Sequence, residues 1–242
     1  MKNILKQLLL VREIRIVVGK LRFYYFAKLI GRIKTLESKD AIDHSVSHNL
    51  KSVSDFGGIR MDKLIRPLSV LENVSKDSKI LVIGPRNEDD ILNLVGHGFS
   101  AKNIIGLDLI SYSPLIEVGD MHSTRFQNSF FDVIVCGWTL SYSNLPDKFA
   151  QEVMRIVKDK GVVAIGVEYS TLTEEQSLSL HGGYHLKPTN FDRINSTNQI
   201  LSLFGGHVRE VFFNHDAPNR ISHSDQIAIN VSNVVTIFSI KK

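Results

Sequence analysis

The sequence predicts an α/β fold, in which a mostly parallel sheet carries helices on both faces. Residues 80–83 form a short apolar, β-branched run that stops at Gly84, as a buried parallel strand does. Residues 104–109 form a second such run, with Asp108 near its end. Between them, residues 88–95 have acids in a first turn and then apolar residues at helical spacing. This order is half of a nucleotide-binding unit, because an acid ending the second strand can accept hydrogen bonds from ribose hydroxyls.

The N-terminal residues 2–35 are predicted to form one long helix or two shorter ones, with Gly19 and Gly31 as weak points. Residues 1–35 carry nine Lys or Arg and one acid, Glu13, which gives a charge of +8. The remaining chain has 20 bases and 24 acids, a charge of −4, so the overall +4 comes from this N-terminal arm.

Three interpretations of the basic arm remain open. The favoured one is a helix that packs on the domain or on a second copy of the chain, which would make a homodimer. The second is contact of residues 1–35 with a membrane surface or an acidic polymer. A membrane-surface helix usually keeps bases and apolar residues on separate faces, and this sequence mixes them. Nucleic-acid binding is least favoured, because no recognition motif accompanies the charge.

The segment between the arm and the first strand divides into two parts. Residues 36–57 are largely polar and are expected to form a linker or short helices. Residues 61–74 are expected to form a helix that Pro67 breaks or restarts, since proline fits a first turn and not a helix interior. We therefore expect an arm and linker over residues 1–57 and an α/β domain over residues 58–242.

The third strand follows the second unusually closely. Residues 116–120 are predicted to form this strand, yet only residues 110–115 separate it from the second. A parallel crossover with its helix takes at least about ten to twelve residues. We therefore expect a bare loop in place of the helix, which leaves one face of the sheet for the N-terminal arm to cover.

The remaining elements complete a sheet of seven strands. Residues 130–138 form the next buried strand, and residues 145–158 form an amphipathic helix. Residues 162–167 form a further strand, and residues 208–214 and 231–240 form two closing strands.

Composition narrows the class of protein. The 242 residues are 43% apolar and 22% charged, as is ordinary for a soluble domain. Cys136 is the single cysteine, which excludes an intrachain disulfide and a cysteine-rich metal site. No apolar run reaches the roughly 20 residues of a spanning helix, and charges interrupt the first residues before a signal-peptide core forms. We expect a cytoplasmic protein, with membrane-peripheral placement as the variant that the arm allows.

Three stretches carry a family resemblance: Ile80-Leu-Val-Ile-Gly84, Gly106-Leu-Asp-Leu-Ile110, and the block Gly119-Asp-Met121, Phe131-Asp-Val-Ile-Val and Arg155-Ile-Val-Lys-Asp-Lys-Gly161. In this order they resemble the class I S-adenosylmethionine-dependent methyltransferases, over roughly residues 60–240. The resemblance implies a Rossmann-like, seven-stranded, mostly parallel sheet and S-adenosyl-L-methionine as the cofactor.

The first motif departs from that family. The family usually has an acid two residues before the first glycine and then glycines at alternate positions, whereas this chain has Val82, Gly84, Arg86 and Glu88. One hypothesis is that Glu88 takes the ammonium of the donor's methionine end and Arg86 pairs with its carboxylate. The alternative is that both are solvated charges at the start of a helix.

The site residues come from the resemblance and from strand ends, where ligands of open α/β sheets bind. The cofactor set that the resemblance implies is Gly84, Pro85, Arg86, Glu88, Asp108, Leu109, Asp120, Met121, Cys136, Gly137 and Trp138. The catalytic candidates on the acceptor side are Glu168, His181 and Tyr142. No metal site is expected, because His181 and His185 lack an evident third ligand.

The predicted function is methyl transfer from S-adenosylmethionine to a polar small molecule, a glycan or a lipid-linked acceptor. One rival is a degenerate methyltransferase-like fold kept as a binding or scaffold protein, with the irregular first motif as the mark of lost activity. The other is a nicotinamide-dependent oxidoreductase. That rival is disfavoured, because the turn lacks spaced glycines and Glu88, Asp89 and Asp90 would repel a pyrophosphate.

Overall fold

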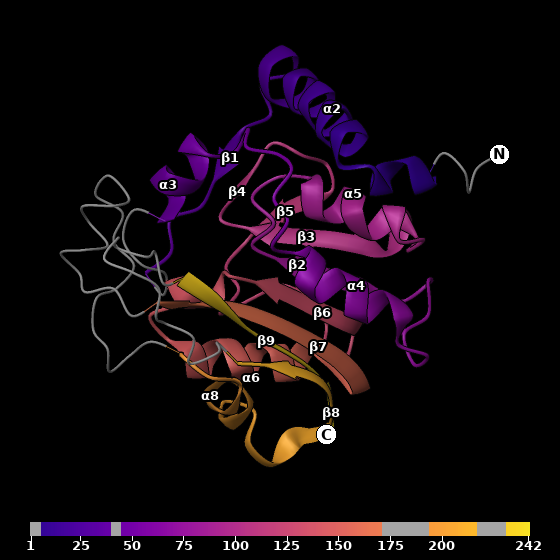
Figure 1. Cartoon of the computed structure of the whole chain (residues 1–242). Helices are drawn as coiled ribbons and strands as arrows, with labels where there is room; N and C mark the ends of the chain where they lie inside the picture. Colours follow the sequence, from indigo (N-terminus) through magenta and orange to yellow (C-terminus); the bar gives the residue numbers. More distant parts are fainter. Residues whose placement is uncertain (1–5, 40–44, 171–193, 217–230) are drawn as a thin grey trace, which may run out of the picture.

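A seven-stranded sheet forms the centre of the computed structural model, which describes residues 6–39, 45–170, 194–216 and 231–242 (Figure 1). The strand order is β5-β3-β2-β6-β7-β9-β8. Strands β5, β3, β2, β6 and β7 are parallel, and β9 runs antiparallel to both of its neighbours. The strands are β2 (Ile80–Ile83), β3 (Ile104–Asp108), β5 (Ile116–Val118), β6 (Phe131–Gly137), β7 (Val157–Ser170), β8 (Val208–His215) and β9 (Val231–Ile240). The predicted Rossmann-like sheet is thereby confirmed.

Alternation along β2 places the core on both faces of the sheet. Ile80 and Val82 belong to the cluster that contains α4 (Asp62–Val70) and α5 (Asp89–Gly96). Leu81 belongs to the opposite cluster, with α6 (Pro146–Ile156) and α8 (Thr197–Ser202). Because successive side chains of a strand point to opposite faces, a fully apolar strand needs helices on both sides.

Pro67 corrects one expectation. Helix α4 runs from Asp62 to Val70, and Pro67 lies inside it rather than at a break or restart. Leu64, Ile65 and Leu68 on either side of the proline are fully buried. The packing of this apolar face outweighs the backbone hydrogen bond that a proline in a helix interior removes.

The end of α6 also differs from expectation. Strand β7 begins at Val157, directly after α6 and before residue 162. The pairing of β6 with β7 shifts register between Phe131 and Val133, and Lys160 takes a positive φ of 62°. The Lys160-Gly161 turn therefore appears as an irregular stretch within the long strand.

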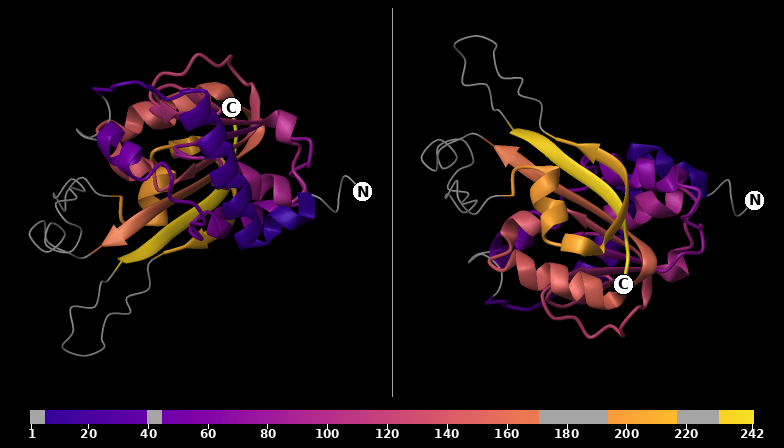
Figure 2. Two further views of the ribbon diagram at one scale, coloured as in Figure 1. Left: turned by 90° about the horizontal axis from the view of Figure 1, so that it is seen from above. Right: turned by 90° about the horizontal axis from the view of Figure 1, so that it is seen from below.

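The N-terminal arm is a helical element that crosses the edge of the domain. A short 3-10 turn, η1 (Leu8–Leu10), leads into α2 (Arg12–Phe23), which continues as the π-helical turn η2 (Tyr24–Leu29). Gly31, with φ at 70°, follows the helical stretch. Seen from above, the arm lies across the same side of the molecule as α5 (Figure 2). The expected packing of the arm on the domain is confirmed.

The arm covers the loop that replaces a crossover helix. No helix lies between β3 and β5 in the structure, as the short spacing predicts. Instead β4 (Ile110–Ser111) pairs antiparallel with β1 (Lys34–Thr35) of the arm. The Tyr112 ring is 1% exposed and meets Phe23 of α2 edge to face, with ring centroids 4.9 Å apart.

The linker contributes one further helix, α3 (Ser45–Lys51), after residues that lie outside the described ranges. Val46 and Val53 join the small apolar cluster beneath the arm. Among the described residues, no helix has the length and apolar character that crossing a membrane requires.

Candidate cofactor and acceptor site

A cavity of about 920 Å³ lies at the carboxyl ends of the parallel strands. Its lining comes from the turns after β2, β3, β5 and β6, from the end of β7, and from residues 45–61, which close it on the arm side. Cofactor and drug-sized ligands bind in pockets of about 300–1,000 Å³. The position is the one at which open α/β sheets bind ligands, because loops diverge there and leave a crevice.

The turn after β2 requires glycine at its first position. Gly84 has φ at 71°, and a Cβ placed there would overlap the Thr139 side chain. The Thr139 hydroxyl in turn donates to the carbonyl oxygen of Ile83 at 3.2 Å. Arg86 also takes a positive φ, 53°, and its backbone N–H donates to Asp108 Oδ2 at 2.8 Å. The turn therefore keeps a tight shape at the cavity wall although Arg86 and Glu88 replace the family's glycines.

Asp108 joins this turn to the end of β3. Its Oδ1 accepts from the backbone N–H of Ile110 at 3.2 Å and from Asn49 Nδ2 at 3.3 Å. Burial raises the pKa of Asp108, and the backbone hydrogen bonds from Arg86 and Ile110 oppose that rise. The carboxylate lines the cavity, so its remaining lone pairs can accept hydroxyl donors from a ligand.

Asp120 after β5 is held by a second set of donors. Its Oδ1 accepts from the backbone N–H of His122 at 2.8 Å and lies 2.6 Å from His122 Nδ1, and Ser38 of the arm donates to its Oδ2. Burial acts to raise the pKa of Asp120, but these hydrogen bonds outweigh it and lower the pKa to about 2. His122 is 2.7 Å from the Ser143 hydroxyl through its other ring nitrogen. The carboxylate is therefore ionised and fixed in orientation.

The side chain of Glu88 points toward the arm, and not into the cavity where the first-motif hypothesis places it. Its side chain is fully buried and forms an ion pair with Arg22 of α2, including an Arg22 Nη2–Glu88 Oε1 contact of 3.0 Å. The hydroxyl of Ser113 donates to the same carboxylate. Glu88 is not among the residues that line the cavity. In this structure its carboxylate binds the arm and lies outside the cavity lining.

Asp89 forms a second anchor for the arm. Arg15 Nε lies 2.9 Å from Asp89 Oδ1, and the two side chains are 3% and 6% exposed. The backbone N–H of Gly57 donates to Asp89 Oδ2 at 3.1 Å. Two successive acids at the start of α5 therefore bind two arginines that lie two helical turns apart on α2.

Asp90 is the third acid of the run Glu88-Asp89-Asp90, and it lines the cavity. Its side chain has no hydrogen-bonding partner in the described part of the chain. Burial raises its pKa to about 8, the neighbouring Asp89 adds to the rise, and Arg15 and Arg86 oppose it. From the sequence, Asp90 is expected only to repel a pyrophosphate. No local pattern separates it from Glu88 and Asp89, because their arginine partners lie more than sixty residues earlier in the chain.

The other predicted cofactor residues divide into two groups. The residues that line the cavity are Gly84, Pro85, Arg86, Asp108, Leu109, Asp120, Met121, Gly137 and Trp138. Cys136 does not line it, because its side chain is fully buried in the core cluster beside α6. Burial raises the pKa of the Cys136 thiol to about 12, so the thiol stays protonated.

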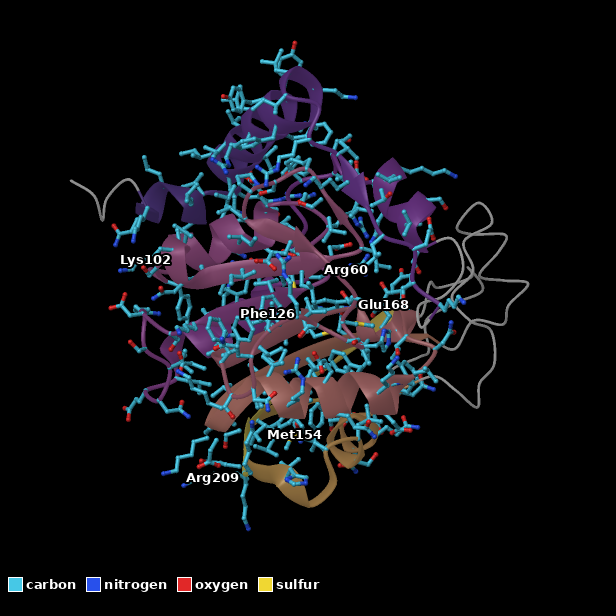
Figure 3. The ribbon with its side chains drawn as sticks, turned by 180° about the vertical axis from the view of Figure 1, so that it is seen from behind. Arg60, Lys102, Phe126, Met154, Glu168 and Arg209 are labelled. Atoms are coloured by element: carbon cyan, nitrogen blue, oxygen red, sulfur yellow. The ribbon has the colours of Figure 1, made fainter. Side chains whose placement is uncertain are left out.

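Trp138, Arg60 and Glu168 form the acceptor side of the cavity. The buried Trp138 takes a positive φ of 61°, and its ring packs over Gly166 of β7, where a Cβ would lie 3.2 Å from the ring. The Arg60 guanidinium lies 6.0 Å from the Trp138 ring centroid and forms an ion pair with Glu168. Figure 3 shows Arg60 and Glu168 next to each other at the strand ends. Arg60 is not among the predicted site residues, because it follows a polar linker and no local pattern marks it as a cavity residue.

Tyr142 lines the same cavity, from the 3-10 turn η4 (Leu140–Tyr142). His181 and His185 lie outside the described residues. Within the described ranges, no cluster of three or more His, Cys, Asp or Glu side chains could hold a metal ion.

Comparisons with known proteins find similarity to methyltransferases. Residues 95–165 match the model of a family described as "methyltransferase domain". No curated protein matches this chain with significant sequence similarity. Among solved structures, a putative methyltransferase of Haloferax volcanii in complex with the Trm112 activator is 13% identical at a TM-score of 0.52, over 85% of this chain and 98% of that one. Geranyl diphosphate C-methyltransferase of Streptomyces coelicolor is 11% identical at a TM-score of 0.51, over 86% and 89%.

Over residues 95–165 the chain is thus similar to a methyltransferase domain, and its fold is the one that these two methyltransferase structures have. A third structure with this fold is the [4+2]-cyclase SpnF, 12% identical at a TM-score of 0.50 over 94% of this chain and 97% of that one. Because a fold hosts more than one chemistry, the activity has to be argued from the site.

Proposed function

We propose that this protein transfers a methyl group from S-adenosylmethionine to a neutral polar acceptor bound between Trp138 and Glu168. The observation that carries the proposal is the charge pattern of the cavity. Its lining holds six carboxylates, from Asp55, Asp89, Asp90, Asp108, Asp120 and Glu168, and two guanidinium groups, from Arg60 and Arg86. An acid-rich cavity suits a donor that carries two positive charges, a sulfonium and an ammonium, and one carboxylate.

The cavity residues match the donor group by group. Asp108 at the end of β3 accepts from the ribose hydroxyls, and Asp120 after β5 lies on the adenine side, as in the family that the chain resembles. Of the two guanidinium groups in the cavity lining, that of Arg86 forms no ion pair with another described residue. It binds the carboxylate of the donor. Asp90, in place of Glu88, takes the ammonium.

The chemistry asks mainly for positioning. When bound, S-adenosylmethionine supplies a methyl group on a positively charged sulfur, which is already activated for displacement. The chain holds the reacting atoms in line, and proximity supplies much of the rate. Glu168 accepts the proton of an acceptor hydroxyl, and Arg60 fixes the carboxylate's orientation through their ion pair. Tyr142 contributes a phenol to the same wall.

The same charges select the acceptor. The carboxylates of Asp120 and Glu168 belong to two different walls, so a polyanionic acceptor would meet repulsion on both sides. A hydroxyl-bearing small molecule, a glycan or the sugar of a lipid-linked precursor would not. The pairing of two copies through the arm stays a prediction.

Methyl transfer can be tested with labelled donor and fractionated extracts. The protein is incubated with S-adenosylmethionine that carries a labelled methyl group and with aqueous and lipid fractions, and the label is followed into products. We expect Glu168→Gln to lower the transfer rate by about 10²–10⁴-fold while the affinity for the donor stays unchanged. Asp147→Asn, an exposed carboxylate on α6, serves as the control.

Two outcomes would contradict this proposal. Donor binding without transfer to any fraction, for the wild type as for Glu168→Gln, would favour a binding or scaffold role. NADH binding in place of S-adenosylmethionine binding would favour the oxidoreductase.

A further inference from the structure

Exposed apolar side chains of this protein are concentrated on one element. Of the 16 large hydrophobic residues that are exposed in the described part of the chain, 11 lie between residues 8 and 36. They are Leu8, Leu10, Val11, Val17, Leu21, Tyr24, Tyr25, Leu29, Ile30, Ile33 and Leu36. Scattered single exposures are ordinary on a soluble protein, but a gathering of this size marks a contact surface.

The inner face of the arm is already occupied. Arg15 and Arg22 bind Asp89 and Glu88, and Arg12 donates from Nε to the carbonyl oxygen of Gly57 at 2.7 Å. A Cβ at Gly19 would overlap the Phe56 ring, so the helix lies directly on residues 56–57. These contacts fix the rotation of α2 about its axis, and the apolar residues on the other side cannot turn inward.

The outer face combines a line of apolar residues with bases. Val17, Leu21 and Tyr24 follow one another at spacings of four and three, which places them on one side of the helix, and they are 55%, 66% and 59% exposed. Leu29 continues the surface into η2, with 65% of its side chain exposed. Helix α2 lies at the outer edge of the molecule, away from the central sheet (Figure 1).

The charges of this outer segment have one sign. Lys20, Lys28, Arg32 and Lys34 are exposed, and within the described ranges none of them forms an ion pair. Residues 14–36 contain no acid at all. Arg15 and Arg22, which bind acids, belong to the inner face together with Phe23 and Ala27. The bases on the outer face are therefore those without an acidic partner in the described part of the chain.

We propose that the outer face of residues 17–36 docks on an anionic lipid surface, with α2 lying in the plane of the interface. Leu and Val side chains would enter the boundary between headgroups and acyl chains, at a depth of about 5–10 Å. Tyr24 and Tyr25 have the amphipathic rings that favour that depth, and the lysine stems reach out to lipid phosphates.

Charge argues for lipid and against a second copy as the occupant. A symmetric dimer through this face would bring two acid-free basic segments together, and like charges across an interface oppose association. An anionic bilayer offers both the negative charge and the apolar layer that the face needs. This docking does not depend on methyl transfer, and it would bring a lipid-linked acceptor near the cavity because Ser38 joins the arm to Asp120.

The test is co-sedimentation of the full chain with vesicles. One set contains phosphatidylcholine alone, and the other contains phosphatidylcholine mixed with phosphatidylglycerol. We expect binding to the mixed vesicles that weakens at high ionic strength, and little binding to phosphatidylcholine. Lys28→Gln with Lys34→Gln should lower the partition coefficient by about fivefold per base.

The apolar contribution has a matched control. Leu21→Gln with Leu29→Gln should lower binding to the mixed vesicles by at least about tenfold. Val70→Gln on α4 replaces a residue that is 78% exposed but lies outside the arm, and it should leave binding unchanged. Thermal unfolding and S-adenosylmethionine binding of each variant show that the fold and the donor site are intact, so failure of docking is separable from failure of the proposed activity.

Three results would overturn the docking proposal: no binding to either vesicle, equal loss in the Val70→Gln control, or unchanged binding of the Leu21→Gln, Leu29→Gln variant. A concentration-dependent dimer in solution that the arm variants dissolve, without vesicle binding, would assign the face to a second copy.

Discussion

Asp90 shows at the scale of one residue how the cavity is prepared for a cation. With a pKa of about 8, its carboxyl group is mostly protonated at pH 7 in the free protein. A cation bound beside it favours the ionised form and lowers the pKa, so binding drives a proton into solution. Affinity for the donor should therefore rise with pH up to about 8 and level off above it.

This linkage gives a calorimetric prediction. Titration of the protein with S-adenosylhomocysteine, which keeps the ammonium, in buffers of different ionisation enthalpy should show release of up to one proton at pH 7. Asp90→Asn should abolish the release and the rise of affinity with pH, whereas Asp147→Asn should preserve both. Proton release that persists in Asp90→Asn would remove Asp90 from the ammonium site.

Gly84 gives a prediction about the shape of the turn. Gly84→Ala forces a Cβ into the space of the Thr139 side chain and puts alanine at φ 71°. We expect a loss of about 2–4 kcal/mol in the free energy of unfolding, measured with urea. Gly205→Ala is the matched control, because its φ is 52° but no heavy atom lies within 4 Å of its Cβ. It should cost only about 1 kcal/mol, and equal losses would show that space at Gly84 is not limiting.

At the scale of elements, the pairing of α2 with α5 explains the irregular first motif. Glu88 and Asp89, which replace the pattern expected at the start of α5, bind Arg22 and Arg15 of the arm. The sequence shows the acids and the arginines but not their pairing, since no local periodicity connects positions so far apart. The arm thereby takes the place of a crossover helix, and residues 45–61 close one side of the cavity.

Removing one partner of the buried Arg15–Asp89 ion pair tests whether this pair attaches the arm to α5. Arg15→Ala leaves Asp89 buried without its cation, and we expect a loss of about 3–5 kcal/mol in the free energy of unfolding. Arg66→Ala breaks the exposed pair with Asp62, in which Arg66 is 70% exposed, and should cost at most about 1 kcal/mol. Similar losses in the two variants would mean that the arm is only loosely attached.

Prediction of elements from sequence succeeds where burial alone decides them. The strand over Ile80–Ile83 and the strand over Val231–Ile240 have the predicted bounds, because long β-branched apolar runs have few other ways to be buried. The prediction for Pro67 was wrong, because the packing of α4 against the sheet overrides the local preference of proline. The ion pair of Glu88 with Arg22 of the arm is a tertiary effect of the same kind.

At the scale of the whole molecule, the cavity is assembled from three separate parts of the chain. Strand ends supply Asp108, Asp120 and Glu168, the turn after β2 supplies Arg86, and the linker with the residues that follow it supplies Asn49 and Arg60. The strand-end residues could be predicted, because the carboxyl ends of parallel strands meet at one edge. The linker's contribution could not, because it depends on where α3 and the following residues fold back onto the sheet.

We infer that this cavity binds S-adenosylmethionine through Asp108. Calorimetric titration of the wild-type protein and of Asp108→Asn with S-adenosylmethionine and S-adenosylhomocysteine tests it most directly, with thermal unfolding as the check on folding. We expect micromolar binding of both ligands by the wild type and affinity lower by about 10–100-fold in Asp108→Asn, because hydrogen bonds to a charged group are lost. Folded wild-type protein that gives no heat and no thermal shift with either ligand would contradict the account.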